Sequence, residues 1–333
     1  MLFRSKNNTE TWYLKLLKLR HFTAFYFLTF LLLGLIPLLS LVFNDGSMDF
    51  TAAADSASQQ TGIPWTSSLI NVLRLSLVEP VLLLSMLGSA VPLLAALVML
   101  VVLRKRQHWT AFAQRLLPYR RTSVGIAAAH YGLIFALLVP CLILVLWLRN
   151  ALGGEYEIEV SFSLMLIGTI VLMSLVDQGA LLEELGWRGF MQPEMQKLAL
   201  SPVVVAVIVG LAWGLWHLPR DITTGVIERL GVMVYLFQFL PAFVLGTISV
   251  SIIAIFFCNR LGGSVIPAII VHGVTNDALG LSGSASITEA LTPFHQITKN
   301  LPFAVIAGLM VWFSGVRLGL HSGSGQAADG GVS

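Results

Sequence analysis

Two adjacent glutamates and an arginine interrupt an apolar stretch of the sequence, in the segment LLEELGWRGF at 181–190. In the middle of a membrane each charge costs about 2.5–3.5 kcal/mol on insertion scales, so Glu183, Glu184 and Arg188 require an explanation. Glu184 and Arg188 are four residues apart, which places them one turn apart on one helical face with the acid nearer the N-terminus. This spacing predicts an ion pair that supports the architecture.

Glu183 points in a different direction on the same predicted helix. At 3.6 residues per turn it lies about 100° from Glu184 and about 140° from Arg188, on a face shared with Trp187 and Phe190. A carboxylate that is not used in an ion pair is available as a general base. We therefore expect Glu183 to be catalytic, with Glu184 and Arg188 as structural support.

His217 is the second candidate, in the segment LAWGLWHLP at 211–219, where Pro219 should stop an apolar helix. Residues 197–202 form the best turn before this helix. Glu183 lies seventeen residues before Leu200 and His217 seventeen after it, so an antiparallel hairpin would bring them to similar depth, in hydrogen-bonding range if their faces agree. This expectation requires the first helix to continue to about residue 198, without a break at Gly179.

His272 and Asn276 are the third candidate, in the segment IIVHGVTND at 269–277. They are four residues apart on one helical face, where interhelical hydrogen bonding is the plainer explanation. With Glu183 and His217 they supply a carboxylate, two imidazoles and a carboxamide. That set contains a general base and donors able to stabilise an oxyanion.

The elements that must position these residues are membrane helices. Of 333 residues 56% are hydrophobic and 11% are charged, which indicates an all-α polytopic membrane protein. The apolar runs lack the alternation of a membrane barrel. We expect about eight transmembrane helices, at about 21–43, 75–103, 124–148, 160–182, 202–218, 231–258, 264–283 and 301–318.

The charges of the connecting segments alternate along the chain. The N-terminal segment and residues 104–121 are basic, whereas 44–66 and 149–160 are mainly acidic. The positive-inside rule therefore predicts that both termini are cytoplasmic, in the inner membrane of a cell. The first apolar run reads as a signal anchor that is retained.

Composition also limits the partners. A net charge of +3 without a basic cluster does not indicate nucleic-acid binding, so the expected partners are the lipid bilayer and a membrane-associated substrate. Cys141 and Cys258 lie in apolar runs and read as buried hydrophobic residues. We divide the chain into an N-terminal part at 1–123 with two helices and a basic loop, a transmembrane core at 124–320, and a disordered Gly/Ser-rich tail at 321–333.

Together the three segments resemble the motifs of the CPBP family, the CAAX proteases and bacteriocin-processing enzymes, also called the Abi family. The family pattern of EExxxR, an aromatic residue four positions before His, and HxxxN or HxxxD matches EELGWR, WGLWH and HGVTN in order and spacing. The resemblance covers about 160–285 and is closest to bacterial members. The one departure is Trp213, where Phe is commoner, which we expect to leave the chemistry unchanged.

The resemblance implies an intramembrane endopeptidase with a CAAX-protease-like core. It assigns the activation of water to Glu183 and His217 and the oxyanion site to His272 and Asn276. The family is often named as metalloproteases, but HExxH is missing and a glutamate-based mechanism that requires no metal fits these residues better. If a divalent metal such as zinc is bound, its ligands would be Glu183, His217 and His272.

Three other functions compete with this one. A rhomboid-like serine protease is suggested by GLSG at 280–283, but Ser282 lies too close to Asn276 in the chain for that arrangement. A catalytically idle scaffold and, less favoured, a transporter would also contain intramembrane charges. The protease motifs leave Arg74, Glu79 and Asp177 unexplained. The bacterial character of the motifs does not favour prenyl substrates, and the sequence does not identify another class of substrate.

Overall fold

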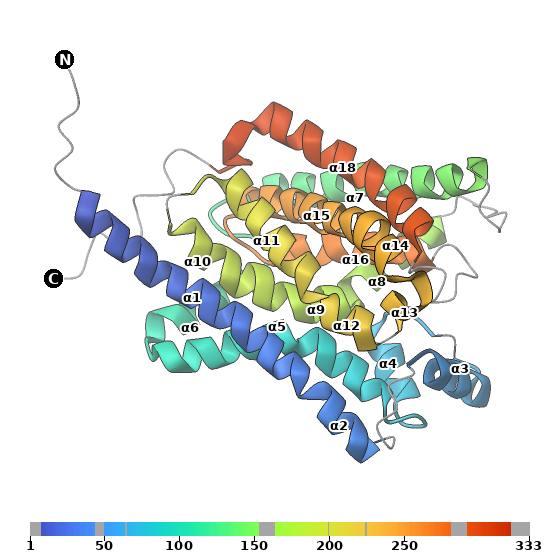
Figure 1. The fold of residues 1–333 in the computed structure, drawn as a ribbon. Helices are drawn as coiled ribbons and strands as arrows, with labels where there is room; N and C mark the ends of the chain where they lie inside the picture. The colour runs from blue at the N-terminus through green and yellow to red at the C-terminus, as the bar shows by residue number, and fades with distance from the viewer. Residues whose placement is uncertain are drawn as a thin grey trace.

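The computed structural model describes residues 8–43, 50–63, 65–152, 164–198, 200–223, 225–280 and 292–320, and these form helices joined by short turns (Figure 1). No β-strand occurs among these residues, although an isolated β-bridge joins Ser68 and Asp177. Helices satisfy their backbone groups internally, as a segment in lipid must. The predicted all-α fold is confirmed.

The helices and helical turns carry the following labels in chain order: α1 (Asn8–Gly34), α2 (Ile36–Phe43), α3 (Phe50–Thr61), α4 (Leu69–Leu75), α5 (Leu82–Leu103), α6 (Arg106–Arg115), α7 (Val124–Ala151), α8 (Leu164–Val176), α9 (Gln178–Gly186), η1 (Trp187–Met191), α10 (Gln192–Gln196), α11 (Pro202–Trp216), α12 (Leu218–Thr223), α13 (Val226–Leu230), α14 (Val232–Val234), η2 (Tyr235–Phe239), α15 (Leu240–Arg260), α16 (Ile266–Gly280), α18 (Pro293–Ser314) and η3 (Gly315–Arg317).

Six segments of the described chain are long and apolar enough to cross a membrane, so the chain is a multi-pass membrane protein. They are Arg20–Leu41, Leu82–Leu103, Val124–Arg149, Pro202–Thr223, Val232–Arg260 and Pro293–Arg317. Each corresponds to one of the eight expected spans. The last span begins well before the expected residue 301. The first turns of α18 contain polar residues, so a hydropathy pattern does not assign them to the span.

The two remaining spans differ from the prediction. The run expected at 160–182 is divided at Asp177, where α8 ends and α9 begins. The run expected at 264–283 forms α16, whose apolar part, Ile266–Asn276, is shorter than the other spans. This helix packs against α7, α8, α9 and α15 in the interior of the bundle. Glu183 and Glu184 lie on α9, and His272 and Asn276 lie on α16.

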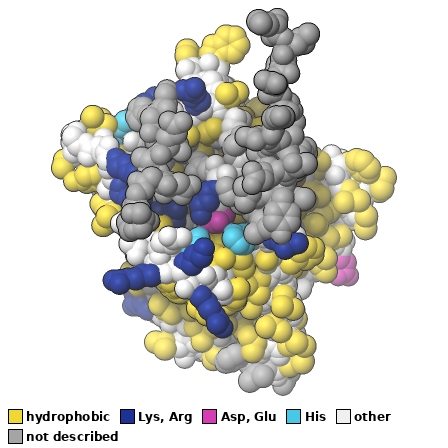
Figure 2. Space-filling view, turned by 90° about the vertical axis from the view of Figure 1, so that its left-hand side faces the viewer, with side chains coloured by type: hydrophobic (Ala, Val, Ile, Leu, Met, Phe, Trp, Pro, Cys, Tyr) yellow, Lys and Arg dark blue, Asp and Glu magenta, His cyan; other side chains and the backbone are white. Residues whose placement is uncertain are grey.

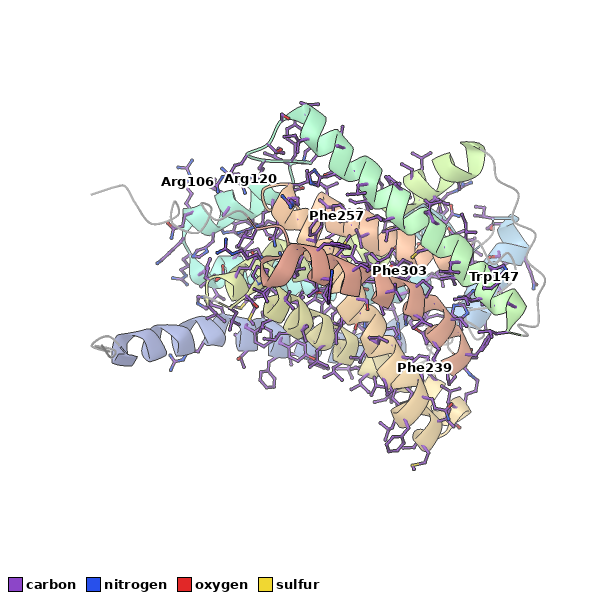
Figure 3. All side chains as sticks on the ribbon, turned by 90° about the horizontal axis from the view of Figure 1, so that it is seen from above. Arg106, Arg120, Trp147, Phe239, Phe257 and Phe303 are labelled. Carbon is purple, nitrogen blue, oxygen red and sulfur yellow. The ribbon has the colours of Figure 1, made fainter. Side chains whose placement is uncertain are left out.

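Basic side chains gather at one end of the bundle, the end that carries α6 (Figure 2). There the α15–α16 turn bonds to the last residue of α6, since Val265 N donates to Arg115 O over 2.9 Å. Figure 3 places Arg106 and Arg120 at this end and Trp147 and Phe239 at the other. The first span begins and the last span ends at this same end. His21, at the beginning of the first span, contacts Glu194 of α10, and the backbone oxygen of Leu318, just after the last span, accepts a hydrogen bond from Asn259 near the end of α15.

Close helix packing in the interior depends on small residues. A Cβ atom at Gly186 of α9 would overlap the backbone of Pro92 in α5, and one at Gly210 of α11 would come within 2.5 Å of the Cα of Ile248 in α15. Small residues permit such approaches between membrane helices. They hold α9 and α11, which carry two of the candidate motifs, at fixed distances from their neighbours.

Several smaller predictions also have an outcome. Cys141 and Cys258 are buried free thiols, as expected. The apolar helix α11 ends before Pro219 as predicted, with His217 as its C-cap. The short helix α12 follows at once, with the proline in its first turn, where its missing N–H costs nothing. Ser282 and the tail at 321–333 lie outside the described residues.

Candidate active site

A helical hairpin carries the first two motifs. From Gln178 the chain is helical to Gln196, through α9, η1 and α10, and α11 starts at Pro202 after the N-cap Ser201. The expected continuation of the first helix and the expected turn are therefore confirmed. Asp177 ends the preceding helix and caps α9, since its Oδ1 accepts from the N–H of Ala180 over 2.6 Å.

Glu184 and Arg188 form the ion pair that their spacing predicts. Arg188 Nη1 lies 2.7 Å from Glu184 Oε1, and both side chains are completely buried. The same oxygen is 3.0 Å from Nδ1 of His272 on α16. Glu184 therefore orients His272 as well as Arg188, a link across two motifs that the sequence did not predict.

Glu183 is bonded to Trp213, not to His217. The indole Nε1 of Trp213 donates to Glu183 Oε2 over 2.7 Å, and both residues are buried. The expected hydrogen-bonding contact between Glu183 and His217 is not among the described hydrogen bonds. The π-helical turn η1 lies between Glu183 and the hairpin turn, and it fits more residues into each turn than an α-helix does. This contributes to placing Glu183 opposite Trp213, which is nearer the hairpin turn than His217.

Trp213 touches all three motifs. Besides Glu183, its ring lies beneath the guanidinium of Arg188, with Cζ 4.8 Å from the ring centroid. It also meets the ring of His272 edge to face, at 4.7 Å between centroids. This tryptophan makes a contact that Phe cannot make, because Phe has no N–H to donate to the carboxylate, and whether the chemistry is unchanged stays a prediction.

His217 lies one turn after Trp213 and has a defined orientation. Its Nδ1 is 2.9 Å from the backbone oxygen of Trp213. A carbonyl oxygen only accepts, so Nδ1 carries the proton and the lone pair of the neutral ring is on Nε2. The ring packs edge to face against Phe243, at 5.0 Å between centroids. His217 can therefore accept a proton or a hydrogen bond through Nε2.

Asn276 is held by Asp177. Its Nδ2 donates to Asp177 Oδ1 over 3.1 Å, and one N–H of the amide remains for another acceptor. A Cβ atom at Gly179 would lie 3.5 Å from Nδ2 of Asn276 and 3.5 Å from Oε1 of Glu183. These two atoms thus border the same space, which Gly179 leaves open. The α9 and α16 motifs converge there.

The three residues named as ligands if a metal is bound are Glu183, His217 and His272. Within the described ranges, no three His, Cys, Asp or Glu side chains are grouped closely enough to hold a metal ion. Glu183, His217 and His272 are not such a group in this structure, and whether the protein depends on a metal stays a prediction.

Two of the three unexplained charged residues now have partners. Asp177, which is completely buried, caps α9 and holds Asn276. Its position before a helix start is the only sequence signal for this role. Glu79 accepts from Ser56 over 2.8 Å and so ties α3 to the start of α5, far along the chain from the motifs. Arg74 is an exposed residue of α4.

The fold and site define a class of polytopic helical membrane proteins with a buried carboxylate, two imidazoles and a carboxamide arranged around α9, α11 and α16. Residues 162–277 match the model of a family described as Rce1-like, type II CAAX prenyl endopeptidase. The match to this family of CAAX proteases confirms the resemblance seen in the motifs. The matched segment contains all three motifs and excludes α1–α7 and α18. No curated protein matches the chain.

Proposed function

We propose that this CAAX-type intramembrane protease hydrolyses a peptide bond with water activated by Glu183 and His217, and that His272 and Asn276 bind the oxyanion. One observation carries the proposal. Trp213 fixes one oxygen of the Glu183 carboxylate, whereas the other, Oε1, borders the space beside Asn276 and receives no hydrogen bond from the described residues. An anchored carboxylate with one free oxygen suits a general base.

The steps follow from these positions. As the water oxygen attacks the carbonyl carbon, Glu183 takes a proton from the water and the carbonyl electron pair moves onto the oxygen. The second amide N–H of Asn276 and the Nε2 of a doubly protonated His272 donate to this oxyanion. When the C–N bond breaks, Glu183 returns the proton to the leaving nitrogen. The products are a new carboxyl terminus and a new amine.

His217 assists through the nitrogen that its backbone contact leaves unprotonated. The bond from Nδ1 to the oxygen of Trp213 leaves the lone pair on Nε2, which can accept a hydrogen bond from the attacking water. Two acceptors, Nε2 of His217 and Oε1 of Glu183, would then orient one water molecule.

The substrate that this setting favours is a membrane-associated or lipid-modified peptide, because the catalytic groups lie within apolar helices. We place the protein in the inner membrane with both termini in the cytoplasm. The basic end of the bundle and the alternating charge of the loops support this orientation by the positive-inside rule.

Comparing the membrane proteomes of cells with wild-type protein and with Glu183→Gln tests the activity. We expect one uncut precursor to accumulate in the variant. A peptide spanning its cleavage site should then be cut by the purified wild-type protein in lipid nanodiscs, and at least about a hundredfold more slowly by the variant. Glu79→Gln, which removes a carboxylate outside the site, is the control. If both strains contain the same proteins, the protein is a scaffold.

A further inference from the structure

A basic surface surrounds α6, the short helix that connects the end of the second span to the start of the third. Residues 104–121 contain six basic residues and no acidic residue. Figure 2 shows dark blue Lys and Arg side chains gathered at this end of the bundle. Four basic residues of this segment are exposed, and we call them the α6 basic surface: Arg104, Lys105, Arg106 and Arg121. They lie outside the segment that matches the family model.

The α6 basic surface carries charge without a counter-ion among the described residues. No carboxylate of the described chain lies within 4.0 Å of its side-chain nitrogen atoms. Glu194, an acidic residue at this end of the bundle, is engaged by Lys197 and His21 instead. The positive charge is therefore not balanced by this part of the chain.

The sequence of the remaining segments does not balance this charge either. Residues 1–20 contain five basic residues and one acidic residue, and the tail at 321–333 contains one acidic residue. The other acidic segments, 44–49, 153–163 and 281–291, follow α2, α7 and α16, whose last residues lie toward the opposite end of the bundle (Figure 1). Two acidic residues cannot neutralise the five basic residues of the N-terminal segment together with the four of the α6 basic surface. Positive charge at this end is therefore available to an anion outside the chain.

The position of α6 relative to the spans places it at the level of the lipid headgroups, because one span ends at Leu103 and the next begins at Val124. In the same segment Trp109, Leu116 and Leu117 are 39%, 45% and 52% exposed. Tryptophan favours the interface between lipid and water, and a helix with both apolar and basic exposed side chains is typical of this layer. A soluble anion would leave these three side chains in water, whereas a phospholipid would also cover them with its acyl chains.

The two arginines that flank α6 are not favoured by their backbone conformation. Arg104 and Arg121 have φ angles of 51° and 53°, in the left-handed region. Glycine and asparagine adopt this region with less strain than arginine does. The local conformation therefore does not account for arginine at either position, whereas a role for the charge does.

Three hydrogen bonds join α6 and the two residues after it to the helices that carry the first and third motifs. Arg115 Nη1 donates to Gly189 O over 3.3 Å, and Arg115 O accepts from Val265 N over 2.9 Å. Leu117 O accepts from the hydroxyl of Ser264 over 2.6 Å. Gly189 lies in η1, which continues α9, and the other two partners immediately precede α16. A ligand that holds α6 in place would therefore also restrain both of these helices.

We propose that anionic phospholipid headgroups bind the α6 basic surface and stabilise the fold through the contacts of α6 with η1 and the start of α16. Phosphate oxygens accept charge-assisted hydrogen bonds from arginine and lysine. A basic segment beside a membrane span attracts anionic lipid with an affinity that rises about fivefold for each positive charge. This binding goes beyond the proposed peptidase activity and does not depend on it.

Thermal unfolding of the purified full-length protein in dodecyl maltoside measures this binding. The added lipid is dioleoyl phosphatidylglycerol or dioleoyl phosphatidylcholine, which have the same acyl chains and differ in the charge of the headgroup. We expect phosphatidylglycerol to raise the unfolding temperature by at least about 3 °C more than phosphatidylcholine does. In 1 M NaCl, which screens charges beyond about 3 Å, most of this difference should disappear.

Two double variants test whether the α6 basic surface is the site. Lys105→Gln/Arg106→Gln should raise the mole fraction of phosphatidylglycerol needed for half of the increase by at least about tenfold. Arg104→Gln/Arg121→Gln should act in the same direction, and it serves as the test if the first variant does not fold.

The matched control removes two positive charges at the opposite end of the bundle. Arg74 and Arg229 are exposed residues of α4 and α13, so Arg74→Gln/Arg229→Gln should respond to phosphatidylglycerol as wild type does (Figure 1). The same loss in the control would show that net charge, and not the α6 basic surface, attracts the lipid.

Four further results would overturn the proposal. Phosphatidylcholine could stabilise the protein as much as phosphatidylglycerol does, or both α6 variants could respond to phosphatidylglycerol as wild type does. Inorganic phosphate alone could give the same increase, which would indicate a site for a free anion. Soluble poly-glutamate could give a larger increase than the lipid, which would indicate an acidic protein partner.

Discussion

The indole N–H of Trp213 donates a hydrogen bond of 2.7 Å to the carboxylate of Glu183, and this bond joins the second motif of the site to the first. Because it engages only Oε2, it fixes the plane of the carboxylate and leaves Oε1 toward the space at Gly179. Trp213 is therefore a positioning residue for the proposed base.

We expect Trp213→Phe to lower kcat by about tenfold to a hundredfold with little change in KM. Phe preserves the ring beneath Arg188 but cannot donate, and a hydrogen bond to a charged group contributes about 1.5–3 kcal/mol. The measurement is steady-state cleavage of the peptide identified with Glu183→Gln.

Trp216 on the same helix provides the control for this variant. Its indole nitrogen is buried without a hydrogen-bond partner, so Trp216→Phe removes an N–H that bonds to nothing. This variant should retain wild-type kcat within about threefold, since no charged-group hydrogen bond is lost. Equal losses in both variants would show that ring volume, and not the bond to Glu183, matters at Trp213.

Glu184→Gln should destabilise the fold by about 3–5 kcal/mol, because Arg188 would keep a buried charge without its counter-ion. Denaturant unfolding in mild detergent measures this change. The double variant Glu184→Leu/Arg188→Met replaces the pair with apolar side chains and should recover most of the lost stability.

Activity gives a different result for the double variant. His272 loses the oxygen that accepts from its Nδ1, so cleavage should stay at least about tenfold below wild type although the fold is restored. Should the double variant be as unstable as Glu184→Gln, an unpaired charge is not the cause of the instability.

Much of this site could be predicted from the sequence, and the exceptions share a physical reason. The pair of Glu184 and Arg188 follows from spacing within one helix, and the hairpin follows from the turn at 197–202. Contacts between helices depend on how each helix is rotated. The bond from Trp213 to Glu183 could not be predicted, because η1 changes the rotation of its helix locally and the sequence contains no signal for a π turn.

The break of the fourth span has a related explanation. A hydropathy pattern shows one apolar run across 160–182, but a buried Asp177 is stable there only as a cap and an acceptor. Its second role depends on Asn276, ninety-nine residues later in the chain. Burial of an acid within an apolar run signals function, but does not reveal the partner.

We expect Asp177→Ala to cost about 1 kcal/mol of stability through the lost helix cap, and to reduce activity by more than that loss explains, because Asn276 is no longer held. Asp177→Asn keeps an acceptor for both partners and should restore most of the activity. Thermal unfolding and kcat are measured together.

Ser201→Ala is the matched control for the cap. Ser201 accepts from Val204 N at the start of α11 and bonds to none of the site residues. Its loss should lower stability by a similar amount without changing kcat. Asp177→Ala with a kcat equal to that of Ser201→Ala would mean that Asp177 only caps its helix.

Gly179→Ala should separate stability from activity most clearly. The added methyl group would lie 3.5 Å from both Glu183 Oε1 and Asn276 Nδ2, which are ordinary contacts, and 3.3 Å from Asp177 Oδ1, which must shift slightly to admit it. Alanine favours a helix over glycine by up to about 1 kcal/mol, so the unfolding temperature should stay the same or rise. The methyl group occupies the space that the attacking water needs, and kcat should fall by at least about a hundredfold.

Gly308→Ala, on α18 with no atom near the new methyl group, should leave kcat unchanged. If Gly179→Ala cleaves peptide at the wild-type rate, water does not bind between Glu183 and Asn276, and the proposed placement of the reaction is wrong.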